Sequence, residues 1–147
     1  MIRAYAADDA LATLTVFTRA VREVARRDYS LEQVSAWAPD DLPVLEWNAR
    51  RLAERTSVAI LDDEVAGFIS VADDYVDMLF VHPLFTRRGV AAELLASAGD
   101  GPLWTNASIT ARGFFEQQGF TVEAEQRVEL RGQTLTNYRM VRGPLAG

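Results

Sequence analysis

A short cationic loop separates a predicted strand from a predicted helix near the middle of the chain. The strand is the apolar run Val76–Val81, and His82-Pro83 ends it because proline cannot donate to a β-ladder. Arg87-Arg88-Gly89 follows, and the helix predicted over residues 90–98 begins after the glycine. The free N–H groups of that helix would face the loop, where two guanidinium groups add positive charge. The loop is therefore suited to bind a pyrophosphate, although the same residues would also fit an ordinary solvated turn.

Asp77 is a carboxylate inside this otherwise apolar strand. Regular alternation would place residues 75, 77, 79 and 81 on one face of the strand and residues 76, 78 and 80 on the other. A buried carboxylate costs free energy unless it is paired, and burial raises its pKa toward the range of a general base. Two interpretations follow: Asp77 is a catalytic base, which we favour, or a structural carboxylate paired with an arginine such as Arg139.

Composition narrows the classes of function. The 147 residues include no cysteine and one histidine, which excludes disulfides, thiol nucleophiles and a metal site built from several histidines of this chain. The net charge of −6 disfavours nucleic acid as a partner, because phosphate neutralisation drives that affinity. No apolar run approaches the roughly 18 residues of a membrane span, and no secretory leader is recognised. We expect a single cytoplasmic domain over residues 1–147, with no metal and no membrane partner.

Helices are predicted on both sides of the central strand. Apolar residues at helical spacing predict a helix over residues 10–27, and a capping box opens another over residues 30–37. A third helical segment is predicted over residues 40–55, with Leu45 and Leu52 on its buried side. A fourth is predicted over residues 110–118. The other strands are predicted over residues 1–5, 57–61, 65–71, 103–107, 120–129 and 135–140.

The connections between these elements predict the sheet. Short turns join the strands between residues 57 and 81, which indicates an antiparallel meander. The helix over residues 90–98 connects the central strand to the strand at 103–107, so these two strands should run parallel. The result is an α+β domain, a mixed α/β sandwich with a mostly antiparallel sheet and helices on both faces. An exposed strand edge over residues 135–140 would be compatible with a homodimer.

Two motifs resemble one known family. Val81-His82-Pro83 followed by Thr86-Arg87-Arg88-Gly89-Val90-Ala91 resembles the acyl-CoA pyrophosphate loop of the GNAT superfamily of N-acyltransferases, Gln/Arg-x-x-Gly-x-Gly/Ala. Gly89 and Ala91 match, whereas Thr86 replaces the usual glutamine or arginine. The segment from Ser108 to Phe120 resembles the family motif Asn-x-x-Ala-x-x-Phe-Tyr-x-x-x-Gly-Phe. Because the order of elements also resembles that of the GNAT fold, the likeness covers nearly the whole chain and implies two parallel strands that splay apart.

The resemblance implies acetyl-CoA as co-substrate and no metal. It places the pantetheine arm against backbone groups of residues 79–81 and the pyrophosphate against N–H groups of residues 87–92. Ser108 stands where the family usually has an asparagine that meets the pantetheine arm. The implied cofactor-binding residues are Leu79, Phe80, Val81, Thr86, Arg87, Arg88, Gly89, Val90, Ala91, Ala92, Ser108 and Phe115.

The resemblance also implies an activity, which is acetyl transfer to a primary amine of a small molecule or peptide by direct attack in a ternary complex. Asp77 would be the base that takes a proton from the ammonium. Phe115 stands where the family often has the tyrosine that protonates the departing thiolate, so the usual acid is absent. Three alternatives follow. The thiolate leaves without a dedicated acid, or the hydroxyl of Tyr138 or Tyr75 supplies the proton, or the protein is a non-catalytic module that binds acyl-CoA. We favour these in that order and name Tyr138 as the candidate acid.

The acceptor amine should be contacted by side chains from three segments. These are the aromatic segment 29–47, the start of the central strand and the closing hairpin at 131–138. Aromatic side chains pack more often than they bind ligands, but at this position they could line a pocket. The predicted acceptor contacts are Trp37, Tyr75 and Asn137.

Overall fold

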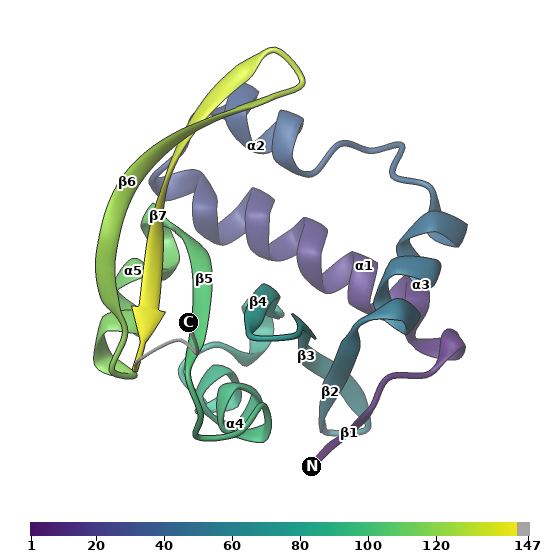
Figure 1. Cartoon of the computed structure of the whole chain (residues 1–147). Coiled ribbons are helices and arrows are strands. Elements are labelled where there is room, and N and C mark those ends of the chain that lie inside the picture. Colours follow the sequence, from purple (N-terminus) through teal and green to yellow (C-terminus); the bar gives the residue numbers. More distant parts are fainter. Residues whose placement is uncertain (144–147) are drawn as a thin grey trace.

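A computed structural model describes residues 1–143 of the chain. Seven strands in this part form one mixed sheet with the order β1-β2-β3-β4-β5-β7-β6 (Figure 1). β4 and β5 are parallel neighbours, and every other neighbouring pair among the described strands is antiparallel. The predicted α+β architecture is thus confirmed. The strands are β1 Ile2–Ala4, β2 Arg55–Leu61, β3 Glu64–Ala72, β4 Tyr75–Val81, β5 Leu103–Ser108, β6 Thr121–Leu130 and β7 Gln133–Arg142.

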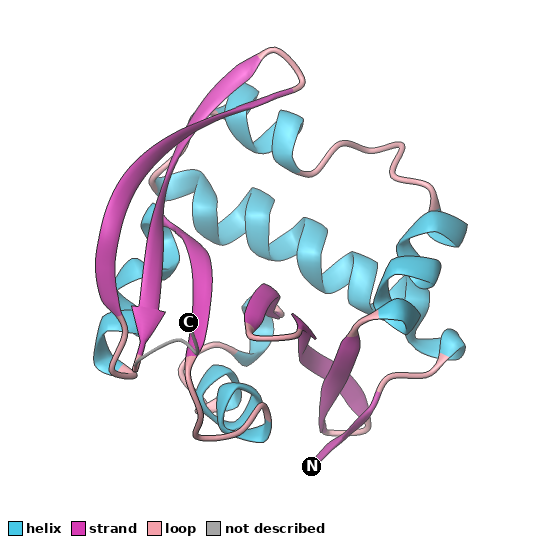
Figure 2. Ribbon diagram, viewed as in Figure 1, coloured by secondary structure: helices cyan, strands magenta, loops and turns pink. Residues whose placement is uncertain are grey.

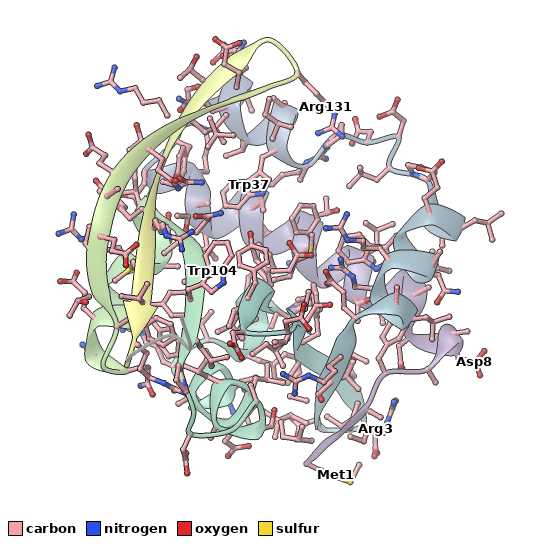
Figure 3. All side chains as sticks on the ribbon, viewed as in Figure 1. Met1, Arg3, Asp8, Trp37, Trp104 and Arg131 are labelled. Atoms are coloured by element: carbon pink, nitrogen blue, oxygen red, sulfur yellow. The ribbon has the colours of Figure 1, made fainter. Side chains whose placement is uncertain are left out.

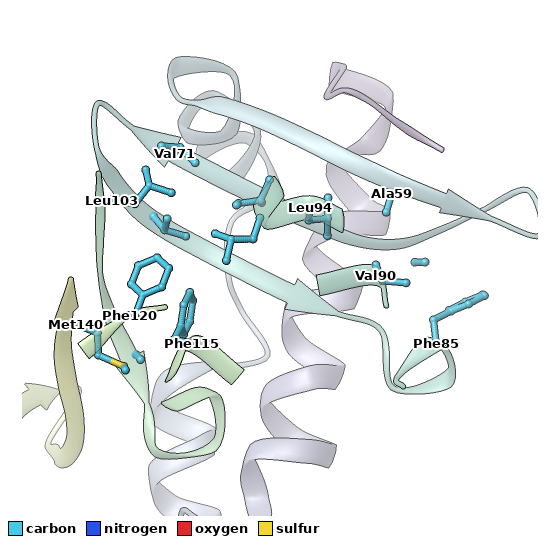
Figure 4. Close-up of a cluster of buried hydrophobic side chains, with 14 residues drawn as sticks. Ala59, Val71, Phe85, Val90, Leu94, Leu103, Phe115, Phe120 and Met140 are labelled. Atoms are coloured by element: carbon cyan, nitrogen blue, oxygen red, sulfur yellow. The ribbon is translucent and has the colours of Figure 1, made fainter. Parts of the chain in front are cut away.

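Helices cover both faces of the sheet, as predicted (Figure 2). One buried core lies between the sheet and the first three helices, and the other lies between the sheet and the last two. Figure 4 shows the second core, in which Phe115, Phe120 and Met140 meet. The helices are α1 Ala10–Arg19, α2 Leu31–Trp37, α3 Val44–Ala53, α4 Val90–Ser97 and α5 Ile109–Gln117.

The helix predicted over residues 10–27 changes its winding after α1. A π-helical segment, η2 (Ala20–Val24), follows α1, and a 3₁₀ turn, η3 (Ala25–Arg27), completes it. The first helical segment therefore reaches its predicted end, but it changes from α-helix to π-helix and then to 3₁₀-helix along the way.

The predicted capping box at the start of α2 is confirmed, because Ser30 Oγ accepts from the Gln33 amide at 3.1 Å while Gln33 Oε1 accepts from the Ser30 amide at 2.8 Å.

The side of α3 that faces the core was predicted wrongly. Leu45 and Leu52 are 85% and 54% exposed, whereas Trp47 and Arg51 are buried. Trp47 Nε1 donates to Thr13 Oγ1 of α1 at 3.0 Å. The Arg51 guanidinium pairs with the carboxylates of Glu54 and Asp77. A buried arginine is stable only when it is paired. The face of α3 that packs on the core is therefore the one on which Trp47 and Arg51 have these partners.

β4 contains a bulge at Asp77. Ser70 of β3 pairs with Met78 and its neighbour Val71 pairs with Val76, so Asp77 is an extra residue without a partner in that ladder. The bulge shifts the alternation of side chains along β4. Val76, Leu79 and Val81 pack in the core on the α4 side, whereas Met78 and Phe80 pack on the α1 side. The prediction that residues 75, 77, 79 and 81 share one face was therefore wrong.

β4 and β5 separate soon after they meet. Their parallel pairing is limited to Tyr75 with Trp104 and Val76 with Thr105. Beyond Val76 the edge of β4 that faces β5 has no strand partner among the described residues, so its backbone groups remain free for another extended chain. This divergence is the splayed parallel pair that the family resemblance implied.

α4 lies close to the C-terminal end of β4 because Gly67, on the neighbouring strand β3, leaves room where α4 packs on the sheet. A Cβ atom at this position would lie 2.7 Å from the Phe80 carbonyl oxygen and 3.2 Å from side-chain atoms of Val90 and Leu94. Any larger residue would therefore push α4 away from the sheet. The glycine fixes the first turn of α4 beside the C-terminal end of β4.

The strand predicted at the edge of the sheet lies inside it. β7 has β5 on one side and β6 on the other, so residues 135–140 do not form an exposed edge. The antiparallel β6–β7 hairpin extends beyond β5 and reaches α2 (Figure 1). Arg131, at the hairpin tip in Figure 3, donates to the Ala36 carbonyl at 2.8 Å. The edge argument for a homodimer therefore fails.

Candidate active site

Two cavities meet where β4 and β5 diverge. The first, which we call the sheet cavity, has a volume of about 330 Å³ and lies among α1, α2, β4, β5 and β7. The second, the loop cavity, has a volume of about 450 Å³ and lies among the 82–89 loop, α4 and α5. Residues that line both cavities show that the two adjoin. They are Trp37, Leu79, Phe80, Ser108, Ala111 and Phe115.

Most residues predicted to bind the cofactor line the loop cavity. Those that do so are Leu79, Phe80, Val81, Thr86, Arg87, Gly89, Ala91, Ala92, Ser108 and Phe115. Two others do not line it. The Val90 side chain is buried in the core, and Arg88 reaches toward Asp62, with 3.4 Å between Nη1 and Oδ2. Of the two loop arginines, Arg87 is the one that lines the cavity.

The first turn of α4 offers unpaired donors to the loop cavity. Gly89 is the N-cap of α4 and has a φ of +77°, a left-handed conformation that favours glycine. The first hydrogen bond within the helix runs from the Glu93 amide to the Gly89 carbonyl at 3.1 Å. The N–H groups of residues 90–92 therefore have no helical acceptor, and they add to the positive end of the helix dipole. These groups suit a diphosphate, which is the fit expected for the loop.

Ser108 lies at the junction of the two cavities. Its Oγ caps α5 by accepting a hydrogen bond from the Ala111 amide at 3.0 Å. The hydroxyl proton is then available to a ligand, because this bond uses only an acceptor position of the oxygen. Phe115 lies at the same junction, and its ring is buried against Phe120 with 5.0 Å between the ring centroids. The junction is therefore apolar where the family often has a tyrosine.

The sheet cavity contains the three predicted acceptor contacts, Trp37, Tyr75 and Asn137, together with Asp77. Phe17 of α1 also lines the sheet cavity. The sequence carries no signal for this contribution, because Phe17 has the spacing of an ordinary buried helix position. Figure 3 shows Trp37 on α2 and Trp104 on β5, the latter beside the cavity where its ring stacks on that of Tyr75 with 4.2 Å between centroids.

Asp77 is part of a buried network of charges. Its Oδ2 lies 3.2 Å from Nη2 of Arg51 and 3.6 Å from Nη2 of Arg50. The neighbouring carboxylate of Glu54 accepts from Ser70 Oγ at 2.7 Å and lies 3.4 Å from the same Arg51 Nη2. The pairing with an arginine that the sequence offered as an alternative is present, but the partner is Arg51 and not the suggested Arg139, which pairs with Glu123 at 2.8 Å. Arg51 and Glu54 could not be foreseen, since the bulge at Asp77 decides what it meets.

Burial is the largest influence on the pKa of Asp77 and raises it above its ordinary value, and the neighbouring Glu54 raises it further. Arg51 and Arg50 oppose this shift without cancelling it. Burial alone would also raise the pKa of Glu54, but the hydrogen bonds with Ser70 and Asp77 and the two arginines outweigh burial and lower it. Of the two carboxyls, Asp77 is thus the one whose pKa is raised, and it lines the cavity, whereas the pKa of Glu54 is lowered.

The two candidate tyrosines lie in different places. The Arg112 guanidinium carbon lies 4.5 Å from the centroid of the Tyr138 ring, and the Tyr138 hydroxyl donates to Glu125 Oε1 at 3.3 Å. Tyr138 is absent from the residues that line the sheet cavity and the loop cavity. Tyr75 lines the sheet cavity, and its hydroxyl accepts from Asn106 Nδ2 at 3.4 Å. The structure therefore brings Tyr75, and not Tyr138, together with Asp77.

Two further features concern the described residues as a whole. No group of three or more histidine, aspartate and glutamate side chains within residues 1–143 is arranged to hold a metal ion. The helices in this part of the chain also fall short of the length and apolar character that crossing a bilayer requires.

Comparison with known proteins shows which family shares this fold. A family described as Acetyltransferase (GNAT) domain matches residues 25–142. The relative named Uncharacterized N-acetyltransferase YafP, from Escherichia coli (strain K12), is 43% identical over 141 residues, which cover 95% of this chain and 93% of the relative.

Solved structures share the fold. The GCN5-related N-acetyltransferase from Rhodopseudomonas palustris is 30% identical, with a TM-score of 0.91 over 98% of this chain and 95% of that one. The structure of yncA from Salmonella typhimurium with its cofactor acetyl-CoA is 20% identical, with a TM-score of 0.66 over 100% of this chain and 96% of the other. The profile match, the relative and the fold lead to one conclusion: this chain belongs to the GNAT acetyltransferase family.

Proposed function

We propose that this protein transfers an acetyl group from acetyl-CoA to a primary amine by direct attack in a ternary complex. The observation that carries the proposal is the position of Asp77, a carboxylate with a raised pKa, in a cavity that adjoins the anion-binding loop cavity. Family membership supports acetyl transfer, and acetyl-CoA is the cofactor of the related yncA structure. The family match over residues 25–142 and the single sheet support treating the chain as one acetyltransferase domain.

The loop cavity is where this proposal places the acyl-CoA. The free N–H groups at residues 90–92 and the Arg87 side chain would hold the pyrophosphate. The unpaired edge of β4 at residues 79–81 would pair with the amides of the pantetheine arm, and the Ser108 hydroxyl could donate to the same arm. The acyl end would then lie near Phe115, where the two cavities join.

Asp77 acts in the sheet cavity. An amine enters it as an ammonium ion, and the Asp77 carboxylate takes one of its protons, directly or through a water molecule. The nitrogen lone pair then forms a C–N bond to the thioester carbonyl carbon supplied by acetyl-CoA, and the C–S bond breaks with its electron pair on sulfur. The thiolate takes up the second proton that the nitrogen releases, which gives the amide and CoA.

The departure of the thiolate needs no dedicated acid in this proposal. A thiol has a pKa of about 8.5, so the thiolate is a competent leaving group near neutral pH. Phe115 provides no proton at the junction, and the Tyr138 hydroxyl is directed toward Glu125. Tyr75 is the candidate tyrosine that lines the sheet cavity, and burial raises its pKa. We assign Tyr75 to acceptor binding and retain its hydroxyl as the alternative acid.

The apolar junction also favours a second candidate function. A protein with Phe115 in place of the usual acid could bind acyl-CoA as a regulatory module without transferring the acyl group. Titration calorimetry with acetyl-CoA and CoA, followed by a thiol-release assay on a panel of amines, separates the two. Binding with thiol release on an amine supports the transferase. Binding without release on every amine supports the module, and no binding contradicts both.

A further inference from the structure

We infer that the acceptor is a small primary amine with an apolar, preferably aromatic body, a single ammonium group and no anionic group. This inference rests on the proposed acetyl transfer and names its substrate class. It follows from the side chains that line the sheet cavity, from the charges that surround them and from the contacts that bound one side of the cavity.

The body of the substrate would meet aromatic side chains. Trp37 is at the centre of this lining, with its ring 6.5 Å from Phe17, 5.6 Å from Tyr29 and 6.1 Å from Phe80 between centroids. All three contacts are edge-to-face, an arrangement that holds each ring in place. Aliphatic side chains from the hairpin, Leu130 and Leu135 among them, line the cavity as well. This surface suits a ring or a branched alkyl group better than a polar chain.

Asp77 is the single formally charged side chain among the described residues that line the sheet cavity. The arginines near Asp77 are engaged. Arg51 and Arg50 lie beside its carboxylate, and Arg139, whose guanidinium lies 4.1 Å from the Trp104 ring centroid, is paired with Glu123. A carboxylate or phosphate on the substrate would therefore be desolvated without a cation to pair with it, which is costly. Amino acids with a free carboxylate and phosphorylated amines are excluded on this ground.

Two polar side chains of the lining, Tyr29 and Thr105, are already bonded within the protein. The Tyr29 hydroxyl donates to the Thr136 carbonyl at 2.6 Å and accepts from the Ile109 amide at 2.9 Å. Thr105 Oγ1 donates to the Val76 carbonyl at 2.9 Å. With one carboxylate present, the cavity can pair one ammonium group, so a second ammonium on the substrate would lose its water without replacement. Polyamines are therefore poor candidates.

Contacts between α2 and the β6–β7 hairpin bound one side of the cavity. Gln33 Nε2 donates to the Thr134 carbonyl at 2.8 Å, and Arg131 donates to the Ala36 carbonyl at the same distance. Together with the bond from Tyr29 to Thr136, these contacts connect the helix to the hairpin on the side of the cavity formed by Leu130 and Leu135. An extended peptide that crossed this side would have to separate the hairpin from α2, whereas a small amine would not.

Thiol release with saturating acetyl-CoA and the full-length protein tests this inference. The panel is 2-phenylethylamine, L-phenylalaninamide, L-phenylalanine, putrescine and a hexapeptide that begins with phenylalanine. L-phenylalaninamide and L-phenylalanine share one body and differ in the carboxylate. We expect kcat/KM to be about a hundredfold or more higher for 2-phenylethylamine and the amide than for L-phenylalanine and putrescine, because each of the latter brings an unpaired charge. The peptide should be a poor acceptor.

The outcomes separate the two proposals. Release that is equally fast or faster with L-phenylalanine, putrescine or the peptide overturns the substrate class and leaves the transferase standing. An absence of release with every amine in the panel and in a wider library refutes acetyl transfer itself.

A substitution at a partly exposed residue of the sheet cavity tests whether the lack of a cation excludes carboxylates. Val128 lines the sheet cavity and is 41% exposed, so Val128→Arg should fold and would add a cation to the lining. We expect the ratio of kcat/KM for L-phenylalanine to kcat/KM for the amide to rise about tenfold or more. Val128→Gln, which adds length without charge, is the matched control. An equal response to both variants would contradict the argument that a missing cation excludes carboxylates.

Discussion

The guanidinium of Arg51 lies 3.2 Å from the Asp77 carboxylate although the Arg51 side chain is 1% exposed. Burial lowers the pKa of Arg51 from its ordinary value, and Asp77 and Glu54 oppose that shift. The Arg51 guanidinium also packs 4.8 Å from the centroid of the Trp47 ring. Asp77 is thus both a partner that stabilises a buried cation and the carboxylate that faces the sheet cavity. The two roles can be separated by substitution.

Asp77→Asn should abolish most of the activity and leave acetyl-CoA binding intact. The amide cannot accept a proton, and a general base typically contributes about 10²- to 10⁴-fold to the rate. Glu54 remains 3.4 Å from Arg51, so the variant should stay folded. Kinetics with 2-phenylethylamine and calorimetry with acetyl-CoA measure the two effects. Asp74→Asn, at an exposed turn beside the same strand, is the control, and near-normal turnover in Asp77→Asn would remove Asp77 from the mechanism.

Glu54→Gln should move the acid limb of the pH profile of kcat/KM to lower pH. Activity rises as Asp77 loses its proton, and Glu54 raises the pKa of Asp77 by hydrogen bonding and by charge repulsion. Glutamine keeps the size and an acceptor for Ser70 but removes the charge, so the pKa of Asp77 falls. The profile is measured from below the limb to neutral pH. A limb that stays in place, or that moves to higher pH, would show that Glu54 does not set the pKa of the base.

Arg51→Ala should destabilise the protein strongly. Removing one partner of a buried ion pair leaves the other charge uncompensated and typically costs about 3–5 kcal/mol in the free energy of unfolding. Urea denaturation measures this change. Glu116→Gln breaks the exposed pair between Arg112 and Glu116, which should contribute at most about 1 kcal/mol. If both variants lost the same small amount, the pair between Arg51 and Asp77 would behave as a surface contact.

Local sequence signals predicted the elements and their order but not this network. Pro83, the Ser30–Gln33 capping box and the glycine before α4 each mark an element boundary through backbone chemistry, and these boundaries are present in the structure. The crossover helix between β4 and β5 determined that the two strands run parallel. The mixed sheet could therefore be derived before any contact was known.

The candidate site depends on features that local periodicity does not encode. The extra residue at Asp77 reverses which side chains of β4 face α1, and an alternating apolar pattern carries no mark of a bulge. Arg51 is buried because it pairs with Asp77 and Glu54, so its burial depends on the tertiary arrangement. From its residue type alone, an arginine would be expected on the surface. The position of Tyr138, away from the cavities, likewise depends on the sheet order β5-β7-β6.

Tyr138→Phe should leave kcat and KM unchanged, because the Tyr138 hydroxyl faces Glu125 and not the sheet cavity. Tyr75→Phe should raise the KM of the amine and keep kcat close to that of the wild type, since a thiolate leaves without an acid. Steady-state kinetics across the pH range test both statements. Loss of kcat in Tyr75→Phe together with loss of the alkaline limb would instead make Tyr75 the acid, and the same result in Tyr138→Phe would require the loop or hairpin to rearrange.

Arg87→Ala should weaken acetyl-CoA binding more than Arg88→Ala. Arg87 lines the loop cavity, whereas the Arg88 side chain lies near Asp62 and 5.6 Å from the Phe85 ring centroid. A hydrogen bond to a charged group contributes about 1.5–3 kcal/mol, so we expect Kd to rise about tenfold or more in Arg87→Ala. Calorimetry with acetyl-CoA measures this change, and thermal denaturation checks that both variants fold.

A truncated donor gives the control for the role of Arg87. S-acetylpantetheine has the thioester and the pantetheine arm but lacks the pyrophosphate, so the wild type and Arg87→Ala should use it equally well. The N–H groups of residues 90–92 would then lack their anion in both proteins, and KM should be higher than for acetyl-CoA. A penalty in Arg87→Ala that persists with the truncated donor would mean that Arg87 supports the loop structure and does not contact phosphate.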